Sequence, residues 1–177
     1  MEKTESEKII LVDVFDNQVG AAGKIEAHQS PKLHRAFSVF VYHEDKMLIQ
    51  RRSTRKYHSG GLLANACCSH PRVGERTEEA VLRRMEEELG AAGVNAKELF
   101  SFVYMHKFQD TLYEYEYDHV FVVDYDGALT IDEEEIDVVK WVEFEELARC
   151  LREQPTTFAS WFLIAAPRVL DAILALH

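Results

Sequence analysis

A segment in the middle of the chain, residues 65–90, constrains the fold more than any other. It places the Cys68 thiol two residues before the His70 imidazole, and it continues into a stretch dense in acidic and basic residues that ends at Gly90. A glycine directly after such a stretch is a typical helix stop. We therefore expect a short strand that carries a thiol and an imidazole, followed by one amphipathic helix.

The expected helix begins with Thr77 as its N-cap. Apolar residues recur at helical spacing and predict a buried stripe of Val81, Leu82, Met85 and Leu89. In projection, Arg84 and Glu88 flank this stripe, whereas Glu79, Arg83 and Glu86 lie opposite it. These two side chains are therefore the charged groups of the helix that we expect to face a pocket.

The rest of the chain mixes β-rich runs with helical stretches and contains neither a repeat nor a linker. Strands are expected over 8–15, 35–42, 46–51, 98–106, 112–125 and 138–144. A polar connection with Lys24 and His28 follows the first strand. Helices are expected over 145–152 and 159–176, the second broken or kinked at Pro167. Strands and helices that do not alternate strictly predict one layered α+β domain over residues 1–177.

Composition excludes several classes of protein. The net charge of −11 argues against nucleic acid as a partner. No apolar run approaches the length of a membrane span, and the Lys- and Glu-rich N-terminus lacks a secretory core. Three cysteines, two of them adjacent, make a poor disulfide framework. We therefore expect a protein of the reducing cytoplasm.

Two glutamates on one predicted strand are the first candidates for chemistry. Glu114 and Glu116 are two residues apart, so both carboxylates point to one face of the strand and the neighbouring tyrosines to the other. Like charges side by side repel unless a cation or a shared proton compensates them. From the strand alone, a solvated face explains the pair equally well.

The spacing from Ser69 to Gly90 is similar to the Nudix pattern G-x5-E-x7-R-E-U-x-E-E-x-G-U, in which U is apolar. Glu75 and Arg83 match that pattern, and the matching residues that follow are Met85, Glu87, Glu88 and Gly90. Ser69 replaces the first Gly, and Arg84 replaces a Glu. A modified Nudix helix preceded by Cys-x-His-Pro resembles the type I isopentenyl diphosphate isomerases.

This resemblance implies a Nudix-like fold, with mixed β-sheets packed between helices, an N-terminal extension and a C-terminal helix. It implies the interconversion of isopentenyl and dimethylallyl diphosphate for isoprenoid biosynthesis, through protonation, a tertiary carbocation and deprotonation. The expected partner is this small isoprenoid diphosphate, with no nucleic acid and no membrane. The expected state is a monomer or a weak dimer.

The resemblance also implies a divalent metal site. The family binds the metal through two histidines before the first core strand, the histidine of Cys-x-His-Pro and the two acids of Glu-x-Glu. The matching residues are His28, His34, His70, Glu114 and Glu116. Three nitrogens and two oxygens suit Mn2+, Mg2+ or Zn2+ with one open octahedral position.

The acid–base groups implied by the resemblance are Cys68 and Glu116. Tyr104 is the implied hydrogen-bond partner of Glu116, and Trp161 places an indole face where the carbocation forms. Strand alternation sends the Cys67 side chain to the opposite face, where buried filler is the expected role. Taken singly, Tyr104 and Trp161 are more often plain core aromatics.

A group of cations matches the family's diphosphate-binding positions. Its members are Lys24, Arg52, Lys56 and Arg84, and Ser69 joins them as a substrate-binding residue. Glu88 matches the acid that holds a second ion, a Mg2+ bridging the phosphates. An Arg at 84 removes a metal ligand that Nudix hydrolases have and adds a phosphate donor. A plain helix salt bridge between Arg84 and Glu88 is the competing explanation.

Two alternative functions stay open. A Nudix hydrolase of diphosphate compounds fits the helix, but Arg84 argues against it. A non-catalytic binder of metal or diphosphate fits the scaffold, but the joint presence of Cys68, Glu116, Tyr104 and Trp161 argues against it. Residues 58–63 depart from the family, which commonly has Trp-Pro-Gly or an aromatic residue there, so the pocket lining in that segment is not predicted.

Overall fold

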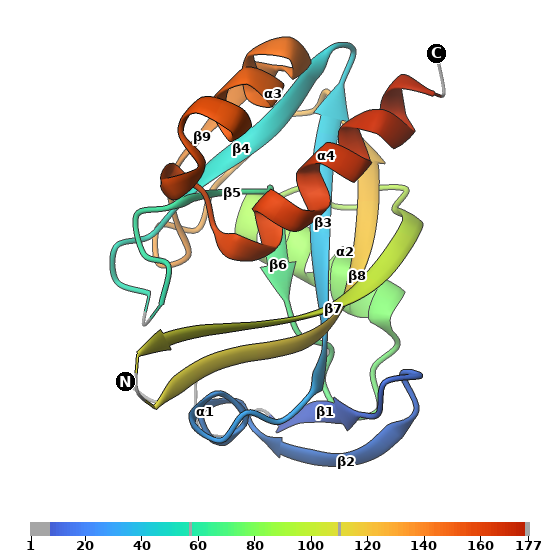
Figure 1. Ribbon diagram of the computed structural model, residues 1–177. Helices are drawn as coiled ribbons and strands as arrows, with labels where there is room; N and C mark the ends of the chain where they lie inside the picture. The colour runs from blue at the N-terminus through green and yellow to red at the C-terminus, as the bar shows by residue number, and fades with distance from the viewer. Residues whose placement is uncertain (1–7, 57, 110, 176–177) are drawn as a thin grey trace.

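The computed structural model describes residues 8–56, 58–109 and 111–175, and Figure 1 shows their arrangement. The strands of this part of the chain form one mixed sheet: β1 (Lys8–Val12), β2 (Gln18–Gly23), β3 (His34–His43), β4 (Lys46–Arg52), β5 (Leu63–Ala64), β6 (Cys67–Ser69), β7 (Lys97–Gln109), β8 (Leu112–Asp124) and β9 (Ile136–Glu143). The helices are α1 (Lys24–Gln29), α2 (Thr77–Leu89), α3 (Phe144–Glu153) and α4 (Ser160–Leu174), with a 3-10 turn at Pro155–Thr157.

Strand β3 is the centre of the sheet. It pairs in parallel with β8 and antiparallel with β6, β4 and β1, while β7 extends the sheet beyond β8. The register sets His34 beside Glu116 and Ser38 beside Cys68. The thiol strand and the strand with the paired carboxylates therefore lie on either side of β3.

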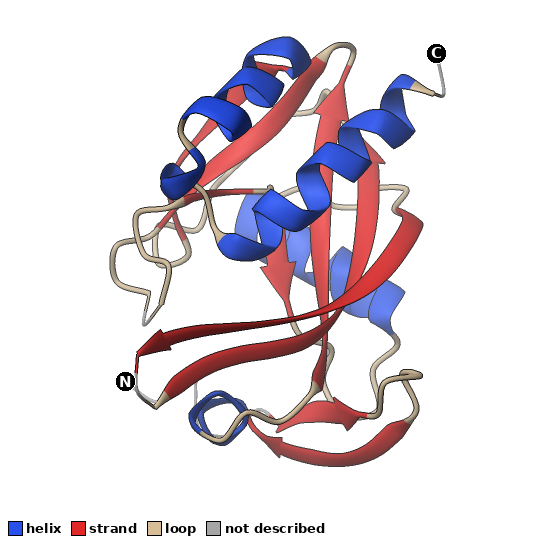
Figure 2. Ribbon diagram, viewed as in Figure 1, coloured by secondary structure: helices blue, strands red, loops and turns tan. Residues whose placement is uncertain are grey.

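Helices cover both faces of the sheet, as Figure 2 shows. Phe40 of β3 packs into a core with α3 and α4, whereas its neighbours Val39 and Val41 pack into a second core with α2. Burial on both faces explains why the sequence of β3 is apolar without alternation. Each large apolar side chain buried in this way contributes about 1.5–3 kcal/mol.

The structure confirms most of the predicted central helix, α2, but not its predicted N-cap. Thr77 is the first helical residue, and the N-cap is Arg76, whose extended backbone donates its N–H to Glu79 Oε2 at 3.2 Å. The predicted stripe is wrong at Leu82, which is 41 % exposed because the buried face is turned toward Ala80. The remaining stripe residues are buried, namely Val81, Met85 and Leu89.

Gly90 ends α2, as the sequence predicts. Its φ of 66° lies in the left-handed region, and a Cβ there would meet Thr130 Cβ at 3.1 Å. The Thr130 N–H donates to the Leu89 carbonyl at 2.8 Å. Glycine is therefore needed both for the conformation and for the close approach of the chain near Thr130.

The N-terminal connection is more ordered than the sequence predicts. The first strand ends at Val12 rather than at residue 15, and a second strand and a short helix follow, β2 and α1. Strand β2 is rich in Gly and Ala and pairs only with β1 within the described sheet. The sequence did not predict β2, because Gly and Ala have low intrinsic β-propensity. The strand is stabilised by its pairing with β1.

Helix α4 continues through Pro167, so the predicted break there is wrong. A proline inside a helix costs about 3 kcal/mol. The apolar face of α4 offsets this cost, because Phe162, Ala165, Ala166 and Val169 are completely buried.

The predicted α+β class is confirmed. None of the described helices is long and apolar enough to cross a membrane.

Candidate active site

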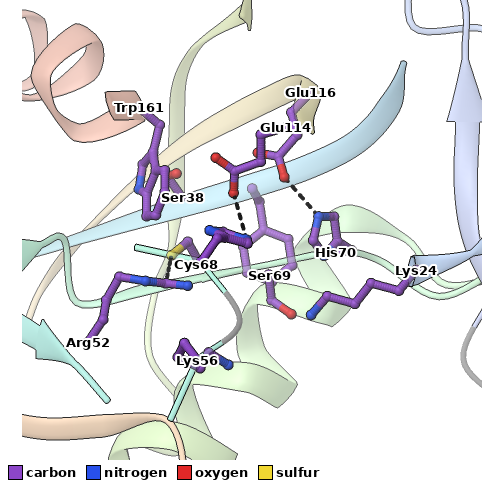
Figure 3. A pocket seen from close by; sticks show the side chains of 12 residues that line it. Lys24, Ser38, Arg52, Lys56, Cys68, Ser69, His70, Glu114, Glu116 and Trp161 are labelled. Carbon is purple, nitrogen blue, oxygen red and sulfur yellow. Dashed lines mark hydrogen bonds and ion pairs between the residues drawn. The ribbon is translucent and has the colours of Figure 1, made fainter. Parts of the chain in front are cut away.

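One pocket collects most of the side chains that the sequence singles out, and Figure 3 shows it at close range. It lies where α1, β3, β4, β6, β8 and the start of α4 meet. The predicted residues in its wall are Lys24, Arg52, Lys56, Cys68, Ser69, His70, Glu114, Glu116 and Trp161. Residues from these elements and from the loop after β4 thus meet at one place.

The two adjacent cysteines have opposite environments. Cys67 is fully buried in the core against α2, whereas Cys68 lines the pocket. This confirms the alternation predicted from the strand. Arg52 Nη1 lies 3.4 Å from the Cys68 sulfur. Burial raises the pKa of the Cys68 thiol to about 12, outweighing the opposite effect of the Arg52 charge, so the thiol keeps its proton at neutral pH.

Glu116 is the most heavily contacted acid of the pocket. Its Oε1 lies 3.0 Å from His70 Nε2 and 3.4 Å from His34 Nε2, and its Oε2 accepts a hydrogen bond from the Tyr104 hydroxyl at 2.7 Å. Burial alone would raise the pKa of Glu116, but the two imidazoles hold it well below its usual range. Glu116 is therefore a carboxylate.

Glu114 lies beside it on the same face of β8. Its Oε2 lies 3.1 Å from the Tyr104 hydroxyl and its Oε1 3.2 Å from His58 Nε2. Glu114 is 4 % exposed and Glu116 is 6 % exposed, so the alternative of a solvated strand face is wrong. Burial and the neighbouring charge of Glu116 raise the pKa of Glu114 well above its usual range.

The histidines gather around these acids in two adjoining groups. His28, His34, His70 and Glu116 each offer a ligand atom within 4.8 Å of the others, and so do His28, His58 and Glu114. The five residues implied by the family resemblance are thus brought together, with Glu114 displaced toward His58. Donor sets of imidazole and carboxylate suit divalent ions.

The orientation of these imidazoles fits a metal. Nδ1 of His28 lies 2.7 Å from the Lys24 carbonyl oxygen, and Nδ1 of His34 lies 2.8 Å from that of Lys32. A carbonyl oxygen only accepts, so Nδ1 carries the proton and Nε2 presents its lone pair to the cluster. Burial lowers the pKa of His28 to about 4 and that of His70 to about 3, which keeps both rings in the neutral, ligating form.

The predicted cations surround a second part of the pocket. Lys24, Arg52 and Lys56 line it, and Arg84 lies close enough to act on the charge of Lys24. Burial lowers the pKa of Lys24, and the nearby positive charge of Lys56 adds to this effect. Arg52 is buried and Lys24 and Lys56 are half-buried, and positive charges gathered in this way form a site suited to a polyanion.

Glu135, in the turn before β9, pairs with two of these cations. It contacts Lys56 Nζ directly, and its Oε1 lies 3.5 Å from Arg84 Nη2. Burial would raise the pKa of Glu135, but Lys56 and Arg84 outweigh that effect and lower it. No motif or periodicity in the sequence indicated Glu135, because its position depends on β9 pairing with β4.

Arg84 and Glu88 lie beside the pocket rather than in its wall. Arg84 forms an ion pair with Glu88 and donates from Nη1 to Glu87 Oε2 at 2.8 Å. Glu88 is 2 % exposed and belongs to neither of the two His/Glu groups found in the described chain. The helix salt bridge considered from the sequence is therefore present, and a phosphate donor at Arg84 stays a prediction.

Trp161 closes the pocket from the side of α4. Its Nε1 donates to Asn65 Oδ1 at 3.0 Å, and Asn65 in turn donates to the carbonyl oxygens of Val39 and Cys67. The Arg52 guanidinium lies 5.0 Å from the centroid of the indole ring. Asn65 thus fixes the indole relative to the thiol strand, a role that sequence reasoning missed.

His58 is the other residue that sequence reasoning missed. It lines the pocket, is 8 % exposed and stacks on Phe108 with ring centroids 4.7 Å apart. Its segment departs from the family, so the resemblance carried no residue to match. The only available signal was a histidine next to a glycine-rich stretch, which is more often a surface residue.

The helix motif itself contributes a structural pair. Arg83 Nε and Nη2 donate to the two carboxylate oxygens of Glu75 at 2.7 and 2.9 Å. Such a bidentate pair ties the segment before α2 to the helix.

The NUDIX domain family matches residues 32–162 of the chain. Isopentenyl-diphosphate Delta-isomerase 2 of Aromatoleum aromaticum is 46 % identical over 166 residues, which cover 93 % of this chain and 87 % of the relative. The chain belongs to the isopentenyl-diphosphate Delta-isomerase family. Isopentenyl-diphosphate Delta-isomerase 2 of Photorhabdus laumondii, 43 % identical with 88 % of both chains covered, is a second relative.

Solved structures show the same fold at lower identity. DR0079 from Deinococcus radiodurans has a TM-score of 0.75 and 24 % identity, and the match covers 92 % of this chain and 98 % of that one. A MutT NUDIX hydrolase from Burkholderia pseudomallei has a TM-score of 0.61 and 18 % identity, covering 75 % of this chain and 95 % of that one. The Delta-isomerase family therefore shares its scaffold with hydrolases, and the site must account for the difference.

Proposed function

We propose that this chain interconverts isopentenyl diphosphate and dimethylallyl diphosphate in the cytoplasm. The observation that carries the proposal is the joint presence of Cys68 and Glu116 in the wall of one pocket that is also lined by Lys24, Arg52 and Lys56. A thiol and a carboxylate serve as acid and base, and the cations suit a diphosphate. Relatives named for this isomerisation support the substrate.

The reaction needs one proton to enter and one to leave. Protonation of the terminal alkene carbon gives a tertiary carbocation, and loss of a proton from C2 gives the isomer. Cys68 and Glu116 are proposed to exchange their protonation states in one turnover, one as donor and the other as acceptor. The thiol is protonated and Glu116 is ionised in the resting protein, so one proton is available and one place accepts it.

Tyr104 and Trp161 are proposed to serve the same reaction from the sides of the pocket. The Tyr104 hydroxyl bonds to Glu116 and holds its carboxylate in place. The indole of Trp161 is buried and presents a π face to the pocket, where it would stabilise the carbocation by roughly 1–2 kcal/mol.

The remaining predicted residues are proposed to hold the substrate and its ions. Ser69 lines the pocket next to Lys24, as Figure 3 shows, and would bind the diphosphate with the cations. A divalent metal at the His/Glu groups would supply positive charge that orients the carboxylate of Glu116. Glu88 is proposed to leave its ion pair with Arg84 and to hold the Mg2+ that bridges the phosphates of the substrate.

A Nudix hydrolase is the second candidate, because the fold is shared with hydrolases. Arg84 argues against it. Hydrolysis by a metal-activated water needs several carboxylates on α2, and Arg84 stands where the Nudix pattern has one of them.

The deciding experiment follows isopentenyl diphosphate by proton NMR in deuterated water with Mg2+ and Mn2+ present. We expect dimethylallyl diphosphate to appear with deuterium at the positions that exchange. A parallel assay measures released phosphate from the same substrate and from nucleoside diphosphate derivatives. Phosphate release without isomerisation or exchange would overturn the proposal in favour of the hydrolase.

A further inference from the structure

Glu135 is an acidic residue placed between two of the predicted diphosphate-binding cations. Its Oε2 contacts Lys56 Nζ directly, and its Oε1 lies 3.5 Å from Arg84 Nη2. Lys56 belongs to the pocket wall that Figure 3 shows, whereas Arg84 lies beside the pocket. The two carboxylate oxygens of Glu135 therefore bridge a cation of the pocket and a cation at its edge.

The negative charge of Glu135 also reaches the other two cations of the group. Burial acts to lower the pKa of Lys24 and of Arg52, and the charge of Glu135 opposes this effect at each of them. All four cations predicted to bind the diphosphate are thus within the electrostatic reach of one carboxylate. A diphosphate bound by these cations would have to replace that charge or tolerate it.

The backbone of Glu135 is fixed by the fold, while its carboxylate reaches solvent. The Glu135 carbonyl oxygen accepts from the Ser53 N–H at 2.9 Å, and the Glu135 N–H donates to the Asp132 carbonyl oxygen at 3.0 Å. Pairing of β4 with β9 sets Arg52 beside Ile136, the residue directly after Glu135. The Glu135 side chain is 27 % exposed. It can therefore leave the cations by rotating toward solvent, with no change in the backbone.

Space and charge both indicate that something at the pocket edge moves when a substrate binds. The pocket has a volume of about 40 Å³, room for roughly three water molecules. A diphosphate that carries a five-carbon chain needs more room than this. An anion that binds Lys56 would also face the Glu135 carboxylate, and like charges side by side repel.

We propose that Glu135 is an internal anion that occupies part of the diphosphate site and swings out when a diphosphate binds Lys56 and Arg84. The inference rests on the proposed function in one respect, since it takes the diphosphate of the proposed substrate as the ligand. In this role Glu135 holds the cations in place and lowers the affinity of the site for an anion that needs both. Substrate and product carry the same diphosphate, so Glu135 weakens the binding of both alike.

The test measures the binding of inorganic diphosphate by isothermal titration calorimetry. Glu135→Gln retains the size of the side chain and removes its charge. We expect the Kd to fall by about tenfold, the order that a hydrogen bond to a charged group contributes. The matched control is Glu134→Gln, which removes one charge from an exposed side chain of the same turn. Solvent and salt screen that charge, so the Kd should stay within about twofold of wild type.

An unchanged or higher Kd in a folded Glu135→Gln variant would overturn the proposal. Glu135 would then stay in place and orient Lys56 for the anion. If Glu135→Gln fails to fold, carbon-13 NMR of wild-type protein labelled at the glutamate carboxyl carbon gives the answer. The Glu135 resonance is identified by its loss in Glu135→Asp, and we expect it to move toward the resonances of exposed glutamates as diphosphate is added.

A Glu135 resonance that keeps its position at saturating diphosphate would equally overturn the proposal. Neither readout needs turnover. A failed isomerase assay would therefore contradict the proposed function and leave the displacement of Glu135 by diphosphate standing.

Discussion

Helix α2 and strand β8 both carry dense charge, but their charges have different partners. On α2, Arg83 pairs with Glu75 and Arg84 pairs with Glu88. On β8, Glu114 and Glu116 have no Lys or Arg ion pair in the described structure, and imidazoles and the Tyr104 hydroxyl contact them instead. The paired helix charges neutralise one another, whereas the acids of β8 lie among imidazoles in groups that are compatible with a divalent cation.

The difference indicates which element of the shared fold carries the reactive groups in this protein. A helix whose carboxylates are neutralised by arginines stabilises the scaffold and has fewer free ligands for an ion. A strand with two buried acids surrounded by neutral imidazoles has negative charge that no described Lys or Arg ion pair neutralises. Uncompensated buried charge of this kind is typical of functional sites. The family motif on α2 thus identifies the fold, and β8 with its neighbours holds the proposed reaction.

The largest expected effect separates Cys68 from Cys67. Cys68→Ala removes one of the two acid–base groups and should lower kcat by about a thousandfold or more, measured by proton NMR of isopentenyl diphosphate turnover. Cys67→Ala removes only a buried sulfur from the core beside α2, so kcat should stay within about tenfold of wild type. An equal loss in both variants would show that the pocket does not distinguish the two faces of β6.

Glu116→Gln tests whether β8 joins metal binding and acid–base chemistry in one side chain. Turnover should fall by about a hundredfold or more, and the metal content should fall with it, since the amide is a poorer ligand. Metal content is measured by mass spectrometry on dialysed protein. Full occupancy in an inactive variant would separate the two roles.

The imidazoles around β8 should make the metal-free protein sensitive to acid. Burial depresses the folded-state pKa of His28 to about 4 and of His70 to about 3, so the unfolded chain binds more protons below its ordinary pKa near 6.5. Stability is therefore fully present above pH 6.5 and is lost as the pH falls toward 4. We expect a loss of about 1.4 kcal/mol per pH unit for each imidazole, measured by urea unfolding at pH 7.5, 6.0 and 5.0.

The smallest expected effect concerns α2. Glu75→Gln weakens the bidentate pair with Arg83 and should lower the free energy of unfolding by about 1 kcal/mol. The kcat should stay within about twofold of wild type, because neither residue lines the pocket. A loss of activity as large as that of Glu116→Gln would mean that the helix takes part in the reaction and that the contrast with β8 is wrong.

Local periodicity was enough for some features of the site. Two-residue alternation placed Cys67 and Cys68 on opposite faces and Glu114 and Glu116 on one face, and both placements are confirmed. Helical periodicity and Gly90 gave the central helix to within one residue. The segment between β1 and β3 was missed, because β2 and α1 are short and depend on packing against their neighbours.

The sequence by itself determined the α+β class and the family. It also determined on which face of a strand or helix the side chains lie where a regular periodicity is present. Only the tertiary structure decided that His58, Asn65 and Glu135 join the site. Each comes from a loop or turn, where no repeat fixes the direction of a side chain. Their positions follow from long-range pairing, such as that of β4 with β9 and of β3 with β6, which brings distant backbone segments within hydrogen-bond reach.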